Sequence, residues 1–158
     1  MMSRLRLSLV TAVLAGSMAG VAEAQTNRAH LGPRIGYNFD VEEIALGAQF
    51  SAPLGDRFEF YPSLDYYFVD PGSLWGFNLD LKYRFSGESF DWAYIGGGLN
   101  ILTADGYGAD DSEAGLNLFF GIESLKGWVH PFGEGRAILS DNSSFQIAAG
   151  LNFTLGQH

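Results

Sequence analysis

A two-residue alternation of apolar and polar side chains runs through most of this chain, from about Ala29 to Leu155. From Leu79 to Phe85, for example, Leu, Leu, Tyr and Phe alternate with Asp, Lys and Arg. Successive side chains of a β-strand point to opposite faces, so one face of such a strand is apolar and the other is charged. A soluble barrel buries its apolar face, whereas a barrel in lipid turns that face outward. The alternation therefore favours a barrel that stands in a membrane.

The alternation predicts eight strands, each close to the ~9–11 residues that a tilted membrane strand requires. Their ranges are 29–39, 44–52, 57–69, 74–85, 91–102, 114–125, 128–139 and 144–155. Tight turns are expected at 53–56, 86–89 and 126–127, and longer connections include 69–73 and 103–113. Short periplasmic turns and longer extracellular loops are typical of outer-membrane barrels. We therefore predict an all-β, eight-stranded antiparallel up-and-down transmembrane β-barrel.

Aromatic residues flank the apolar bands, as they do in the interfacial girdles of membrane barrels. The outer girdle is predicted to hold Tyr66, Phe68 and Trp75, and the inner one Phe58, Phe60, Tyr83, Phe85 and Phe153. Three prolines, Pro33, Pro62 and Pro131, fall inside predicted strands. Proline cannot donate to the ladder, so a bulge or bend is expected near each of them.

The N-terminal segment has the pattern of a secretory signal peptide, with two early arginines, an apolar stretch and the small-x-small site Ala22-Glu23-Ala24. We expect residues 1–24 to be cleaved and residues 25–158 to form one barrel domain. The chain has no cysteine, so disulfide and thiol chemistry are excluded. A net charge of −9 argues against nucleic acid, whose phosphates require Lys and Arg.

Four segments resemble the small outer-membrane β-barrel family, which includes OmpX-like barrels and barrels like the OmpA transmembrane domain. They are Gly32-Pro33-Arg34-Ile35-Gly36-Tyr37, Tyr94-Ile95-Gly96-Gly97-Gly98-Leu99, His130-Pro131-Phe132-Gly133-Glu134-Gly135-Arg136 and Gly150-Leu151-Asn152-Phe153-Thr154-Leu155. The resemblance covers the chain after the signal and implies an outer-membrane location. Many members end on an aromatic residue, whereas here Gly156, Gln157 and His158 follow the last strand.

The inward faces of the predicted strands carry a set of opposite charges: Arg34, Glu59, Asp65, Asp80, Lys82, Arg84, Glu123, Glu134 and Arg136. An eight-stranded barrel leaves an interior that side chains roughly fill. Unpaired charges in so narrow a space are costly, so paired charges that close the lumen are favoured over an ion path.

Counting back from the predicted turns gives a register for two hairpins. If Phe68 faces Trp75, Glu59 lies opposite Arg84; around Lys126-Gly127, Glu123 lies opposite His130 and Asn117 opposite Arg136. Each of these registers could be displaced by two residues without changing which face a side chain occupies.

Catalysis is disfavoured by the placement of the histidines. Nucleophilic catalysis needs a Ser, a His and an orienting carboxylate within reach of one another. His30 and His158 lie near the chain ends, while Ser140, Ser143 and Ser144 lie at the opposite end of a strand from His130. Neither a nucleotide-binding loop nor a zinc-ligand cluster is present, so we predict a protein that is not an enzyme and has no cofactor.

The longer connections carry acidic residues without Lys or Arg: Asp40, Glu42, Glu43, Asp70, Asp105, Asp110, Asp111, Glu113 and Asp141. Two explanations account for these residues equally well: simple solvation of exposed loops, and contacts with divalent cations or a cationic partner. The candidate metal contacts are Asp105, Asp110, Asp111 and Glu113, although they lack the spacing of a calcium loop.

The function that the sequence favours is a non-catalytic outer-membrane barrel with a structural or surface-interaction role. Its expected partners are outer-membrane lipid and, at the loops, divalent cations, and the barrel is expected to be a monomer. Two alternatives stay open: a narrow channel for small solutes or ions, and a soluble periplasmic binding barrel similar to lipocalins.

Overall fold

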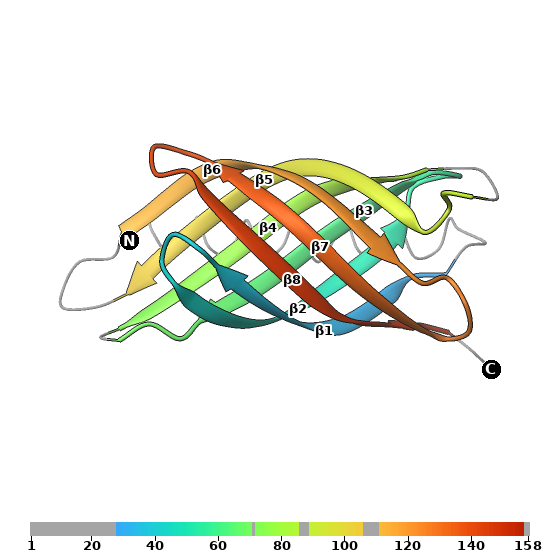
Figure 1. Cartoon of the computed structure of the whole chain (residues 1–158), viewed down its shortest axis with the longest axis horizontal. Coiled ribbons are helices and arrows are strands. Elements are labelled where there is room, and N and C mark those ends of the chain that lie inside the picture. Colours follow the sequence, from blue (N-terminus) through green and yellow to red (C-terminus); the bar gives the residue numbers. More distant parts are fainter. Residues whose placement is uncertain (1–27, 71, 86–88, 106–110, 157–158) are drawn as a thin grey trace, which may run out of the picture.

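The computed structural model describes residues 28–70, 72–85, 89–105 and 111–156, which form a closed barrel of eight tilted antiparallel strands (Figure 1). The strands are β1 (His30–Asn38), β2 (Glu43–Pro53), β3 (Phe58–Tyr67), β4 (Ser73–Arg84), β5 (Ala93–Asp105), β6 (Asp111–Glu123), β7 (Val129–Leu139) and β8 (Ser144–Thr154). Each strand pairs with its neighbours in sequence, and β1 pairs with β8 to close the barrel. The predicted signal peptide, residues 1–24, lies outside the described residues.

The two ends of the barrel differ in what they carry. The termini end holds the start of β1, the end of β8 and the connections 54–57, 85–92 and 124–128; the loop end holds the connections 39–42, 68–72, 106–110 and 140–143. The predicted long loop at 103–113 is shorter than expected, because β5 continues to Asp105 and β6 begins at Asp111. The connection 85–92 is longer than the predicted tight turn. Connection length therefore does not distinguish the two ends here.

The exterior of the barrel is apolar and the interior is polar. In β4, Leu79 and Leu81 are 43% and 44% exposed, whereas Asp80 and Lys82 between them are 3% and 1% exposed. The same alternation recurs in β6, where Leu118 is 55% exposed and Asn117 is buried. A soluble binding barrel would need the opposite arrangement, with an apolar lining and a hydrophilic exterior.

Aromatic side chains cluster on the outer surface near both ends. At the loop end, Tyr66 packs against Phe68 and Trp75, with ring centroids 5.2 and 4.8 Å away. At the termini end, Tyr83 packs against Phe58 and Phe85, at 5.2 and 5.7 Å. Rings gathered in this way at the two rims have the arrangement of interfacial girdles.

The prolines do not produce the bulges predicted from the sequence. The β1–β2 register runs without a shift from His30↔Ser51 to Asn38↔Glu43, through Pro33, and the registers around Pro62 and Pro131 are equally constant. Pro33 pairs with Ala48 of β2, while its pairing with β8 is interrupted. A strand residue directs its N–H toward one neighbour only, so a proline removes one ladder bond and leaves the register intact.

Glycines provide the space for large side chains inside the barrel. Gly96 pairs with Phe119 across β5 and β6, and Gly121 pairs with Tyr94. A Cβ on either glycine would overlap the aromatic ring of its partner. Small and large inward residues therefore alternate across these strands, which lets large side chains fit inside a narrow barrel.

Within the described residues, no helix has the length and apolar character needed to cross a membrane.

Candidate functional site

The inward-facing charges predicted from the sequence lie together inside the barrel. Seven of them are nearly inaccessible, with exposed fractions between 1% and 5%: Arg34, Asp65, Asp80, Lys82, Glu123, Glu134 and Arg136. The side chains of Glu59 and Arg84, nearer the termini end, are 12% and 13% exposed. The charges come from β1, β3, β4, β6 and β7. β2, β5 and β8 contribute none of them.

The group nearer the termini end consists of two carboxylates and two cations. Lys82 Nζ lies 2.8 Å from Glu59 Oε2 and 3.4 Å from Glu123 Oε2. Arg84 Nη2 lies 3.0 Å from Glu59 Oε1 and 2.7 Å from Glu123 Oε2. Each cation therefore bridges both carboxylates, and charge-assisted hydrogen bonds of this kind are roughly twice as strong as neutral ones.

The group in the middle of the barrel is built around Arg136 of β7. Its Nη1 donates to Asp80 Oδ2 at 2.6 Å, and its Nε and Nη2 donate to Glu134 Oε1 at 3.1 and 2.8 Å. Arg34 of β1 forms ion pairs with Asp65 at 3.1 Å and Glu134 at 3.8 Å. The Arg34–Asp65 pair lacks hydrogen-bond alignment, so it is held by charge and proximity.

Three aromatic residues that the sequence prediction did not include contact members of both groups. Tyr61, Tyr94 and Phe119 form a buried cluster, and both tyrosine hydroxyls donate to Glu134 Oε2, at 3.2 and 3.0 Å. Lys82 Nζ lies 4.3 Å from the Tyr61 ring centroid, a cation–π distance. The inward direction of these rings could be read from the alternation, since each lies an even number of residues from an inward polar side chain of its own strand: Glu59 for Tyr61, Asn100 for Tyr94 and Glu123 for Phe119.

Buried amides of β2, β6 and β8 extend the network. Asn117 donates to Asp80 at 2.8 Å, and Asn152 donates to Glu123 at 2.7 Å. Gln49 donates to Asn152 at 2.6 Å and accepts from the Tyr61 hydroxyl at 2.9 Å. The carboxylates are thus held by neutral donors as well as by cations, as buried charges require.

Both predicted hairpin registers are wrong by two residues. Glu59 lies opposite Lys82 instead of Arg84, because β3 ends at Tyr67 and Tyr66 pairs with Trp75. Arg84 still reaches Glu59 diagonally. A two-residue displacement preserves the face of every side chain, so alternation cannot detect it.

The β6–β7 hairpin shows the same displacement, since its connection runs from 124 to 128. Glu123 lies opposite Phe132 and Asn117 opposite Ile138. The expected His130–Glu123 pair is absent: the His130 ring nitrogens lie 2.7 Å from the Ser124 carbonyl oxygen and 2.9 Å from Thr154 Oγ1.

Of the four predicted metal contacts, only Asp105 and Glu113 have side chains that the structure describes, so the prediction stays a prediction. Asp105 ends β5, whereas Glu113 is the third residue of β6 and pairs with Leu102; Glu113 Oε1 accepts a hydrogen bond from the Asn142 backbone at 3.2 Å. Asp110 and the side chain of Asp111 lie outside what the structure describes. In the parts of the chain that it does describe, no group of three His, Cys, Asp or Glu could hold a metal ion.

Two solved structures share this architecture. The N-terminal β-barrel domain of Pseudomonas aeruginosa OprF superposes with a TM-score of 0.68 at 14% identity, covering 82% of this chain and 98% of that one. Neisserial surface protein A (NspA) gives a TM-score of 0.57 at 15% identity, covering 81% of this chain and 95% of that one. No protein-family model matches the chain, and no curated protein matches it.

The fold is therefore that of the small eight-stranded transmembrane β-barrels. The closed strand order, the apolar exterior and the polar interior all agree with it. At these identities the likeness extends to the fold, while the interior charges are a property of this sequence.

Proposed function

We propose that the protein is a non-catalytic outer-membrane barrel whose interior is closed by paired charges, with a structural or surface-interaction role. The observation that carries the proposal is the pairing of all five inward carboxylates with the four inward cations. Paired side chains that fill the lumen leave no room for water, whereas a conducting pore needs a continuous aqueous path.

The placement of the catalytic residue types supports a role without chemistry. Both ring nitrogens of His130 have structural partners. Ser140 and Ser143 lie in the β7–β8 connection at the loop end, whereas His130 begins β7 at the termini end. A nucleophile and its base would have to be within hydrogen-bond reach of each other.

Conductance of the purified barrel in planar bilayers tests the proposal. The wild-type barrel is expected to be electrically silent. Glu59→Gln removes the carboxylate that Lys82 and Arg84 share, and this variant is expected to show current because two cations lose a common partner. Lys126→Gln, which changes a surface cation at the same end, is the control and should stay silent.

A stable, reproducible conductance of the wild-type barrel would contradict the closed interior and favour the narrow channel instead. A silent Glu59→Gln barrel that is folded would show that this carboxylate does not keep the path closed.

A further inference from the structure

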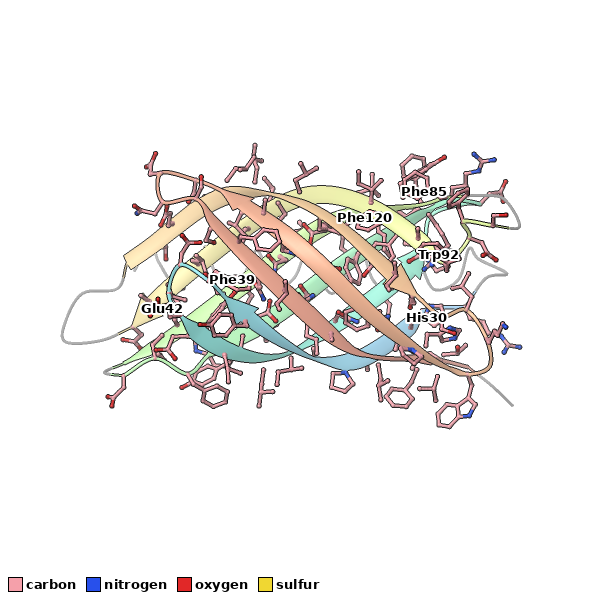
Figure 2. The ribbon with its side chains drawn as sticks, viewed as in Figure 1. His30, Phe39, Glu42, Phe85, Trp92 and Phe120 are labelled. Carbon is pink, nitrogen blue, oxygen red and sulfur yellow. The ribbon has the colours of Figure 1, made fainter. Side chains whose placement is uncertain are left out.

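An open cavity of about 490 Å³ lies at the termini end of the barrel, next to the paired charges Glu59 and Arg84. Its lining includes Arg28 and His30 at the start of β1, Arg57 before β3, Arg84 at the end of β4 and His130 at the start of β7. Figure 2 places His30 at this end and Phe39 and Glu42 at the opposite one. Segments far apart in the sequence thus bring three arginines and two histidines to one opening.

Arg84 presents a donor that the described residues do not use. Its Nε and Nη2 are held by Glu59 and Glu123, which fixes the plane of the guanidinium. Its Nη1 is buried and has no hydrogen-bond partner among the described residues. An unpaired buried donor is costly, and Arg84 is the only residue with an unpaired buried side-chain atom, among the described residues, that also lines this cavity.

The charges around the cavity favour an anion. Three arginines line it against two carboxylates, Asp56 and Glu59. Glu59 already accepts from Lys82 and Arg84, whereas Arg28 and Arg57 are exposed at the surface. One Arg57 nitrogen, Nη1, donates to the Tyr83 hydroxyl at 3.2 Å, so the rest of its fork is available.

The whole barrel is polarised in the same direction. Among the described residues, the Lys and Arg side chains that do not face the barrel interior all lie at the termini end: Arg28, Arg57 and Lys126. The connections of the loop end carry acidic residues and no Lys or Arg. An anion is therefore attracted to one end of the barrel and repelled from the other.

We propose that this cavity binds an oxyanion group, a phosphate or a carboxylate, through Arg84 at its base and Arg28 and Arg57 at its mouth. The planar guanidinium presents donors in a fork that matches both kinds of oxyanion. Such a ligand would place an oxygen acceptor beside the Arg84 guanidinium, which lines the cavity. The site would let the barrel hold an anionic molecule at its termini end, a role separate from closing the lumen.

Isothermal titration calorimetry of the folded barrel in zwitterionic detergent tests the site, with inorganic phosphate and acetate as probes and chloride to keep ionic strength constant. The wild type is expected to give a saturable isotherm. The double variant Arg28→Gln/Arg57→Gln is expected to bind at least ~10-fold more weakly, since each arginine supplies charge-assisted bonds. Arg84→Gln should weaken binding further, and the double variant keeps the test valid if Arg84→Gln does not fold.

The matched control is Lys126→Gln, a cation at the same end that does not line the cavity. Its affinity should equal that of the wild type. A lack of saturable binding, or an equal loss in Lys126→Gln, would overturn the proposal, because the effect would then be diffuse attraction to a basic rim.

Vesicles distinguish a soluble oxyanion from a lipid phosphate. If the ligand is a headgroup, vesicles of phosphatidylcholine with anionic phosphatidylglycerol, in a buffer without free phosphate, should raise the thermal stability of the wild type above that of the double variant, and pure phosphatidylcholine should not. If it is a soluble group, free phosphate or acetate should stabilise the wild type equally in both vesicles. The same melting temperature for wild type and double variant under all these conditions would contradict the site.

Discussion

Gly150 of β8 lies directly against the backbone of Pro33 in β1, at the pair of strands that closes the barrel. A Cβ on Gly150 would overlap the Pro33 carbonyl oxygen and come within 3.0 Å of the Arg34 Cα. Because the overlapping atoms belong to backbone, they cannot move aside as a flexible side chain would. The absence of a side chain at Gly150 is thus part of what allows β1 and β8 to meet.

Gly150→Ala is therefore expected to destabilise the folded barrel by about 2 kcal/mol or more, as overpacking does. Gly133→Ala is the matched control, since a Cβ on Gly133 meets nothing within 4 Å. Both changes reduce the entropy of the unfolded chain similarly, so their difference isolates the overlap. Urea unfolding in lipid vesicles measures it, and equal stabilities of the two variants would contradict the close contact.

Arg136 is expected to be the most sensitive charge in the interior. Arg136→Gln leaves Asp80 and Glu134 without their main cation, and breaking a buried pair in this way costs about 3–5 kcal/mol. The double variant Arg136→Gln/Asp80→Asn should recover part of the loss, because it restores the balance of interior charge. The test compares the unfolding midpoints of the two variants with that of Arg57→Gln, a control at an exposed position. A double variant no more stable than Arg136→Gln would show that charge balance is not the cause.

The prediction about divalent cations at the loop end has not been tested by the structure. We expect millimolar calcium or magnesium to raise the melting temperature in vesicles that contain anionic lipid, because divalent cations bridge carboxylate and phosphate oxygens. Replacing Asp105, Asp110, Asp111 and Glu113 by Asn or Gln should reduce that rise. Asp56→Asn/Asp91→Asn, at the termini end, is the control. An unchanged response in the fourfold variant would leave solvation as the role of these carboxylates.

The alternation predicted the strand number, the antiparallel order and the inward face of every charge, because side-chain direction in a strand has a period of two. That same period hid the register, so the Glu59–Arg84 and Glu123–His130 cross-strand pairs were wrong by two residues. Register depends on the lengths of the connections, and the β6–β7 connection proved longer than Lys126-Gly127 suggested.

The aromatic and amide part of the interior was not predicted, although its parity was available. Tyr61 and Tyr94 carry apolar rings as well as hydroxyls, so a pattern that sorts residues into apolar and charged does not assign them to a polar lumen. The places of Tyr94 and Phe119 depend on the space left by Gly121 and Gly96, each of which belongs to the neighbouring strand. Contacts of that kind follow from register and become visible only in three dimensions.

Spin-label accessibility tests the inside-out barrel most directly. The chain has no cysteine, so a nitroxide can be attached at a single engineered position, Leu118→Cys on the exterior of β6, with Asp141→Cys in the loop-end connection as the aqueous control. In lipid vesicles, oxygen is concentrated in the hydrocarbon region and a nickel chelate stays in water. A label at position 118 should be relaxed strongly by oxygen and protected from the chelate, and one at position 141 should show the reverse. Exposure of the label at position 118 to the chelate, equal to that at position 141, would contradict a barrel that faces lipid.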